Sequence, residues 1–380
     1  FAMTVNNTDT FLVERSGTSY KLQAQNLMAD LQDTDLMLVE RSGTSYKATG
    51  LDIKDSLGSN LFPNFEIDDC FKTFYYTGNG STQSFTTGFD CRASAGGCLI
   101  LFADINSGAS VTYYADTKMG TGKLGRWTQT NVPGSTTNGV TSFDSNGFSI
   151  GANGNINTNN ATYRCQVFKV HAGFFDMQEY GPSSSSTNPT TVNHNLGAQP
   201  CMMMLRNQDF AMANMYYRPG GISSYSEHGT QTNLDPQDDF FTSEPTSTSF
   251  TVGQTQSNRQ GDEYIAYIWG GQPGGAGVDY PVTFGTYVGY STEIITNGTK
   301  PQFALFKALF GTSGGRAGFY LDKGNIDNSS TYNRANSWSY NQRESINNKV
   351  IFSTTDVSFN NPPNEIAANN FIYFYYFIGR

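Results

Sequence analysis

The sequence predicts a mostly β protein, and three observations support this. Charged residues make up only 14% of the 380 residues, against about 25% in an average globular protein. Aromatic residues also reach 14%, and the polar remainder is mostly Gly, Ser, Thr and Asn; many short strands joined by tight turns require such a mixture. Similar strand patterns recur about 100 residues apart, the size of a β-sandwich domain. We predict an N-terminal tandem of hairpins, each with a short helix, followed by three β-sandwich, jelly-roll-like modules.

The N-terminal segment contains a repeated unit. The sequence LVERSGTSYK occurs at residues 12–21 and again at 38–47. In each copy an apolar run precedes the turn SGT and the stretch SYK follows it, which is typical of a β-hairpin. The stretches AQNLMADL and TGLDIKDSL come behind the hairpins and carry apolar residues at i and i+4, which predicts one or two helical turns.

Residues 1–67 contain few large apolar side chains for a folded unit. A segment this short rarely buries enough apolar surface to offset the entropy lost on ordering. Adjacent apolar residues also face opposite sides of a strand, so both faces need cover. We expect a docking arm that becomes ordered against other subunits; the alternative is an edge extension folded back on the following domain. The expected contact residues are Leu12, Val13, Arg15, Tyr20, Leu38, Val39, Arg41 and Tyr46.

The remaining chain divides into modules at residues 68–175, 176–276 and 277–380, with PGGAG at 273–277 as the clearest linker. Each module contains an apolar run after a Gly-bearing turn and ends on a second apolar run. Continuous apolar runs predict strands buried on both faces. The last run, residues 371–378, is expected to lie centrally in a sheet or against a neighbouring chain.

The five cysteines are expected to be free core residues. Their number is odd and no CxxC pair exists, so a disulfide framework is not predicted. A bridge between Cys91 and Cys98 across a hairpin remains the alternative.

Motifs of catalysis and metal binding are missing from the sequence. The carboxylates of DPQDD at 235–239, with Glu227 and His228 upstream, fit no oxygen-ligand loop and predict solvated surface. The three methionines at 202–204 predict a core strand rather than a thioether metal site, and His194 predicts a polar loop. We therefore expect neither an enzyme nor a cofactor-binding protein.

The charge distribution argues against nucleic acid as a partner. The net charge is −9 and Lys and Arg form no cluster, whereas phosphate recognition needs several clustered cations. The longest apolar run has eight residues, well short of the roughly 18 of a membrane span. The first residues show neither a basic nor an apolar signal region, so no export signal is expected.

Aromatic residues set among polar ones are candidate sugar contacts. Trp338, Tyr340 and Arg343 lie together in NRANSWSYNQR, where ring faces stand beside amide and guanidinium donors. Trp127, Tyr216, Tyr217 and Tyr225 are further candidates. The alternative is that these residues fill interfaces between modules.

Two stretches carry a resemblance to phage proteins. DTDLMLVERSGTSYKATGLDIKDSL resembles a short element of structural proteins in marine cyanophages. NHNLGAQPCMMMLRNQD and EYIAYIWGG in the second module are similar to a domain repeated in phage virion and tail-fibre-like proteins. The resemblance implies a virion structural protein and supplies no catalytic residues.

We therefore expect a tail or fibre component, located in the virion after assembly in the host cytoplasm. Residues 1–67 would anchor it to other virion proteins of the tail, baseplate or neck, and the β-modules would project outward to contact host-surface glycans. A homo-oligomer is expected, with a trimer favoured. The alternatives are a capsid decoration or neck protein, and a carbohydrate-binding adhesin that reads its receptor with residues 277–380.

Overall fold

The chain consists of two compact units, residues 1–65 and 66–380. The computed structural model describes residues 10–15, 18–23, 36–41 and 44–49 of the first unit. In the second it describes residues 66–379 except 105–111, 128–130, 182–188, 219–223, 228–234, 237–239, 254–256, 275–280, 290–293, 297–300, 311–318, 323–333, 338–342, 346–349, 353–355 and 360–371. The predicted β class is confirmed, because helical structure within these residues is limited to the 3-10 turns η1 (Ile67–Asp69) and η2 (Ala93–Ala95) and to the single 3-10 residue Arg218.

The first unit contains the two predicted hairpins. β1 (Thr10–Arg15) pairs with β2 (Thr18–Gln23), and β3 (Leu36–Arg41) pairs with β4 (Thr44–Thr49). Both hairpins have the same register, so that Val13 lies opposite Tyr20 and Val39 opposite Tyr46. β1 also pairs with β3, which gives one four-stranded sheet in the order β2-β1-β3-β4. The predicted helical turns fall outside the described residues.

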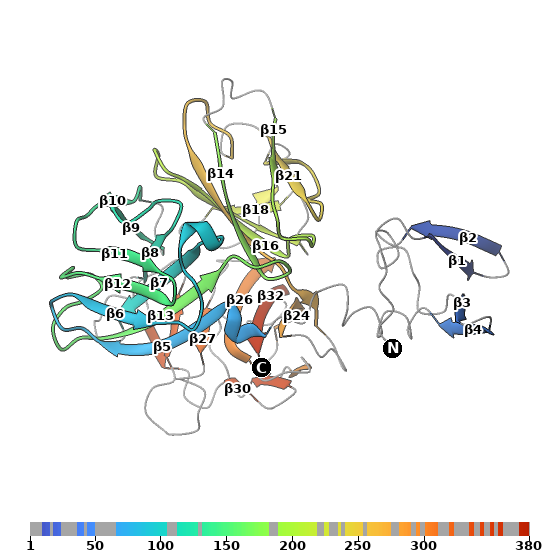
Figure 1. Ribbon diagram of the computed structural model, residues 1–380, viewed down its shortest axis with the longest axis horizontal. Helices are drawn as coiled ribbons and strands as arrows, with labels where there is room; N and C mark the ends of the chain where they lie inside the picture. The colour runs from blue at the N-terminus through green and yellow to red at the C-terminus, as the bar shows by residue number, and fades with distance from the viewer. Residues whose placement is uncertain are drawn as a thin grey trace. The chain divides into compact units, whose positions relative to one another are not determined.

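The second unit contains three β-sandwiches of the same topology (Figure 1). In the first, a large sheet has the order β10-β9-β8-β7-β13-β5 and a small sheet the order β11-β12-β6. Its strands are β5 (Phe71–Thr77), β6 (Gln83–Thr86), β7 (Cys98–Asp104), β8 (Thr112–Asp116), β9 (Lys123–Arg126), β10 (Gly134–Ser135), β11 (Val140–Asp144), β12 (Gly147–Ile150) and β13 (Thr162–Lys169).

The second sandwich repeats this order with every strand number raised by nine. Its sheets are β19-β18-β17-β16-β22-β14 and β20-β21-β15. Its strands are β14 (Phe175–Tyr180), β15 (Thr190–Asn193), β16 (Met202–Asn207), β17 (Ala213–Tyr217), β18 (Ser224–Glu227), β19 (Asp235–Pro236), β20 (Phe241–Ser243), β21 (Ser249–Val252) and β22 (Tyr264–Trp269).

The third sandwich has the sheets β29-β28-β27-β26-β32-β24-β23 and β30-β31-β25. Its strands are β23 (Gln272–Pro273), β24 (Val282–Val288), β25 (Ile294–Thr296), β26 (Pro301–Phe310), β27 (Phe319–Asp322), β28 (Arg334–Ser337), β29 (Arg343–Ser345), β30 (Val350–Phe352), β31 (Asp356–Phe359) and β32 (Ile372–Gly379). β32, the last apolar run, lies between β24 and β26, which is the first of its two predicted positions.

Each sandwich carries a stacked tyrosine pair at the same place, where β5, β14 or β24 pairs with the last strand of its sandwich. The ring planes of the three pairs lie within 17° of parallel, with centroids 4.9–5.1 Å apart. The pairs are Tyr76 with Tyr163, Tyr180 with Tyr264, and Tyr287 with Tyr373. The repeated pair fixes the residue-by-residue equivalence of the three sandwiches.

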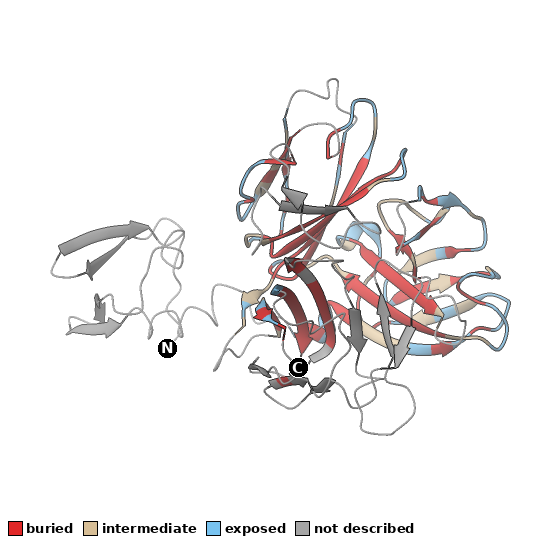
Figure 2. Ribbon diagram, turned by 180° about the vertical axis from the view of Figure 1, so that it is seen from behind, coloured by how far each residue is buried: buried red, intermediate tan, exposed pale blue. Residues whose placement is uncertain are grey.

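The large sheets are buried on both faces, as the apolar runs predict. Every residue of β16 and β22 is buried, as are all but the end residues of β7 and β13 (Figure 2). One face covers the core of its own sandwich, where Phe102 on the large sheet meets Phe148 on the small sheet at 5.9 Å between ring centroids. The other face packs against the neighbouring sandwiches.

The outer faces of the three large sheets meet in one shared aromatic core. Phe168 of the first sandwich contacts Trp269 of the second at 6.2 Å and Phe303 of the third at 6.0 Å between ring centroids. The second and third meet through Tyr217 and Phe374 at 5.1 Å. Each sandwich therefore depends on the other two to cover its second apolar face.

A polar network crosses the boundary between the first two sandwiches. The fully buried Arg206 places its guanidinium 4.7 Å from the ring centroid of Tyr114. Its Nη2 donates to the carbonyl of Asn131 at 3.2 Å and its Nη1 to that of Trp127 at 3.5 Å. The hydroxyl of Tyr267 donates to buried Asp116 at 2.7 Å. These bonds satisfy polar groups that the shared core removes from water.

The third sandwich carries Lys307 where the second carries Arg206. Both stand on the central strand, opposite the residue that follows the repeated tyrosine. Burial lowers the pKa of Lys307 to about 8 from its ordinary 10.5. Between these values the unfolded chain binds more protons than the folded one, so the folded state gains stability as the pH rises through this range.

We predict different pH dependences for Lys307→Met and Arg206→Met. Lys307→Met removes the group whose pKa burial lowers to about 8, so its stability relative to the natural chain should fall as the pH rises from 8 to 10.5. Arg206→Met removes a donor from two carbonyls and should destabilise the protein by about 1–3 kcal/mol at both pH values. Chemical denaturation at pH 8 and pH 10.5 measures this; the same pH dependence in both variants would contradict the assignment.

Candidate functional site

A polar cleft of about 360 Å³ lies between the first two sandwiches. The turn after β8 and the start of β9 form one wall. The end of β14, the start of β22 and the residue after β16 form the other. The lining residues are Lys118, Met119, Lys123, Glu179, Tyr180, Gly181, Gln208, Glu263, Tyr264 and Ile265.

The lysine-bearing wall is anchored by the buried carboxylate of Asp116. Its Oδ1 accepts the backbone N–H of Met119 at 2.8 Å, and its backbone carbonyl accepts that of Gly120 at 3.1 Å. Its Oδ2 accepts the hydroxyl of Tyr267 in the second sandwich. Burial raises the pKa of this carboxyl above its usual range. One side chain thus holds the turn that presents Lys118 and ties it to the opposite sandwich.

The opposite wall is built on the stacked pair Tyr180 and Tyr264. The Tyr180 hydroxyl donates to the carbonyl of Ser257 at 2.8 Å, and the Tyr264 hydroxyl accepts the backbone N–H of Arg259 at 3.0 Å. Burial raises the pKa of both phenols, which stay neutral at physiological pH. The pair gives the cleft a wall of fixed geometry.

The charges of the lining balance. Lys118 Nζ lies 3.9 Å from Glu179 Oε2 across the cleft, with side chains 31% and 58% exposed. An exposed pair of this kind adds little stability. Lys123 and Glu263 add one further charge of each sign, so the lining offers two ammonium donors and two carboxylate acceptors with no net charge.

Gln208 is the buried polar residue of the lining, only 8% exposed. Its Nε2 donates to the carbonyl of Arg206 at 3.2 Å. Its Oε1 is buried and has no hydrogen-bond partner among the described residues. A flipped amide would set two oxygens against each other at Arg206, so the oxygen is the group without a partner.

The cleft is suited to binding a polar ligand through hydrogen bonds. Among the described residues, no group of three or more His, Cys, Asp or Glu side chains is arranged to hold a metal ion. No helix within the same residues is long and apolar enough to cross a membrane.

The predicted docking residues lie on the four strands of the first unit. Val13 and Val39 pair with Tyr20 and Tyr46 respectively. Leu12 and Leu38 lie opposite lysines, and Arg15 and Arg41 opposite threonines, one set in each hairpin. The sheet thus brings the eight residues together as two matching sets, and their docking role stays a prediction.

The predicted sugar contacts divide into two groups. Trp338 and Tyr340 lie outside the described residues, and Arg343 begins β29, opposite Asn336, so this prediction stands untested. The prediction that Trp127, Tyr216 and Tyr217 are exposed sugar contacts is wrong, because all three are buried. Trp127 packs on Tyr267 and Trp269 between sandwiches, and Tyr217 on Phe374, as the interface alternative predicts. Tyr216 belongs to the core of its own sandwich.

Other sequence predictions concern core residues. All five cysteines are free and buried, so the alternative bridge between Cys91 and Cys98 is not formed. The three methionines of β16 are buried, as predicted for a core strand. His194 differs from the polar-loop prediction: it is buried and its ring stacks on Phe250 with 22° between the planes. Burial lowers its pKa.

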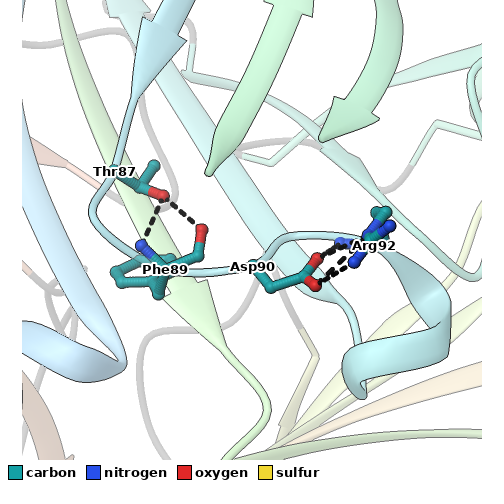
Figure 3. Close-up of polar contacts among 4 residues, drawn as sticks. All are labelled: Thr87, Phe89, Asp90 and Arg92. Carbon is teal, nitrogen blue, oxygen red and sulfur yellow. Dashed lines mark hydrogen bonds and ion pairs between the residues drawn. The ribbon is translucent and has the colours of Figure 1, made fainter. Parts of the chain in front are cut away.

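Cys91 belongs to the first core and lies in the segment that connects β6 with β7. Side-chain contacts of Thr87 and Asp90 hold this segment (Figure 3). The hydroxyl of Thr87 donates to the carbonyl of Phe89 at 2.8 Å and accepts its N–H at 3.3 Å. Beyond it, Arg92 donates to both carboxylate oxygens of Asp90. These bonds lower the pKa of Asp90 to about 2. This surface ion pair lies outside the cleft.

The second unit coincides with a known domain family. A domain of unknown function, DUF7483, matches residues 67–373. The chain belongs to the DUF7483 family. The matched region begins at η1 and ends in β32, so a single DUF7483 domain includes all three sandwiches. No curated protein matches the chain.

The cleft residues of the DUF7483 domain were not predicted from the sequence. Lys118 and Gln208 stand 90 positions apart, and only the packing of two sandwiches brings them together. One sequence signal could have pointed to Gln208: the apolar run MMML is followed directly by the polar residues RNQD.

We predict that Gly181→Ala destabilises the DUF7483 domain by about 2–4 kcal/mol. Gly181 has φ +92°, and a Cβ there would lie 2.5 Å from the carbonyl oxygen of Asp262, so both strain and a clash oppose a side chain. Gly197 also has positive φ, +71°, but nothing lies within 4 Å of its Cβ position. Gly197→Ala should therefore cost only about 1–2 kcal/mol. Thermal unfolding of both variants tests this, and an equal loss would contradict the close approach.

Proposed function

We propose that this protein is a structural component of a phage virion, most directly of the tail or a tail fibre. One observation carries the proposal: two hairpins of identical register form one sheet, and they precede the three sandwiches along the chain. The resemblance of the hairpin element to cyanophage structural proteins supports the same role.

The first unit offers two matching surfaces for docking. Its sheet ends on β2 and β4, and within the described residues no further strand pairs with either. The outer strand of a sheet carries backbone donors and acceptors that a strand from another subunit can pair with. Because the hairpins repeat each other, the two edges present the same sequence, TSYK, to two similar niches of an assembly.

The DUF7483 domain is suited to the exposed part of such a component. Its sandwiches bury their second faces against each other, so a homotrimer, which we favour, would form through other surfaces, with the first unit as the leading candidate. The weakly charged body would project outward and contact host-surface glycans, and the first unit would contact other virion proteins. The described residues carry no feature that favours an enzyme over this role.

Deletion of residues 1–65 tests the proposal. The deletion is made in the phage gene that encodes this protein. We predict that the shortened chain folds and melts like the DUF7483 domain of the full chain, yet is absent from purified particles. Removing one hairpin should reduce incorporation, because one of two matching surfaces remains. Quantitative mass spectrometry of particles gives the copy number, and Asp90→Asn serves as a folded surface control.

Incorporation of the shortened chain at full copy number would contradict the docking role. A copy number that is a small multiple of three or six agrees with a tail position. Hundreds of copies per particle would instead indicate the alternative role, capsid decoration.

A further inference from the structure

We propose that His194 is an acid-sensitive switch: when its ring takes up a proton, the turn at residues 194–200 opens and releases the connectors that join the three sandwiches. The inference concerns the DUF7483 domain alone and goes beyond the docking role proposed for the first unit.

The turn that follows β15 depends on one nitrogen of the His194 ring. Nδ1 accepts the backbone N–H of Leu196 at 3.3 Å, so this nitrogen carries no proton. The ring is buried and stacks on Phe250, and the backbone N–H of His194 donates to the carbonyl of Thr248 at 2.8 Å. A proton on Nδ1 would set two donors against each other and break the bond to Leu196.

The first sandwich forms the same turn without a histidine. Thr87 follows β6 as His194 follows β15, and the backbone N–H of each donates to the residue that precedes the paired strand, β12 or β21. The Thr87 hydroxyl accepts the backbone N–H of Phe89, two residues further on, at 3.3 Å (Figure 3). Nδ1 of His194 accepts from the residue at the same offset. The fold therefore requires an acceptor at this position, and a threonine, which does not titrate, supplies it equally well.

Leu196 ties this turn to two connectors. It is fully buried, and its carbonyl accepts the N–H of Gly173, which lies between β13 and β14, at 2.6 Å. Gly270 lies between β22 and β23. A Cβ placed on Gly270 would lie 3.3 Å from Cδ1 of Leu196 and would also meet the carbonyl oxygen of Gly173. The two connectors thus meet beside Leu196, and opening of the turn removes a hydrogen bond and an apolar contact from their junction.

The surroundings of the ring favour its neutral form. Burial lowers the pKa of His194. Among the described residues, Asp176 on β14 is the charged group that opposes this shift, and its Oδ2 already accepts the backbone N–H of Asn195 at 2.7 Å. β21 faces the ring with Phe250, and the turn before β21 with the carbonyl of Thr246, neither of which titrates.

The direction of the pH effect follows from these two states of the turn. An open turn exposes the ring, whose pKa then returns to its ordinary 6.5, whereas the pKa in the closed turn is lower. Below pH 6.5 the open turn therefore binds a proton that the closed turn does not. The opening constant rises as the pH falls, by up to about tenfold per pH unit, until the closed turn is protonated as well.

Hydrogen exchange of the full chain between pH 7 and pH 5 tests the inference. Mass spectrometry follows the peptides that contain Gly173 and Leu196, and each rate is corrected for the intrinsic pH dependence of amide exchange. We expect the opening constant of these peptides to rise by about tenfold from pH 7 to pH 5. The peptide that contains Thr87 is the internal control and should show no such rise.

Three variants assign the effect to one ring. His194→Thr copies the first sandwich, and His194→Asn keeps a side-chain acceptor; both should have the same opening constant at pH 5 as at pH 7. His171→Asn removes the histidine of the connector between β13 and β14, and it should keep the acid response of the natural chain. Circular dichroism confirms that each variant is folded.

Either of two results would overturn the inference. One is an opening constant at Leu196 that stays the same from pH 7 to pH 5 in the natural chain. The other is an undiminished rise in His194→Thr or His194→Asn, which would assign the acid response to another group.

Discussion

The need to bury both faces of three large β-sheets governs this structure. Each sheet covers its own sandwich core with one face and leaves a second apolar face, which contains Phe168, Trp269 or Phe303. These faces meet in one shared core, so the sandwiches satisfy each other within a single chain. Apolar burial contributes about 25 cal/mol per Å², and aromatic side chains bury the largest areas. The three sandwiches are therefore expected to be stable together and weak apart.

The same packing explains where charges can be buried and where a ligand can bind. Where the first two sheets meet, Asp116 and Arg206 are removed from water and receive partners from the neighbouring sandwich. Beyond that buried network, the sandwiches diverge and leave a cleft whose walls the network holds. The cleft thus depends on the shared core, because neither sandwich alone contains both walls.

Much of the fold could be predicted from the sequence, and the part that could not is instructive. The hairpins were predictable because ten residues repeat without change, and the central strands because apolar residues dominate β7, β16, β26 and β32. The sequence did not predict what packs against the second apolar face of each large sheet. Its apolar pattern shows that this face must be buried, but not which part of the chain buries it. Trp127 and Tyr217 consequently resembled loop aromatics. The cleft was out of reach for the same reason: its residues converge only through packing.

Hydrogen exchange of the full chain, followed by mass spectrometry, tests the shared core most directly. Amides in one cooperative unit exchange through the same opening, with the same free energy. The account predicts that β13, β22 and β32, the last strands of the three sandwiches, exchange together with one free energy of opening. Exchange of β32 at a far lower free energy, while β13 and β22 stay protected, would contradict it.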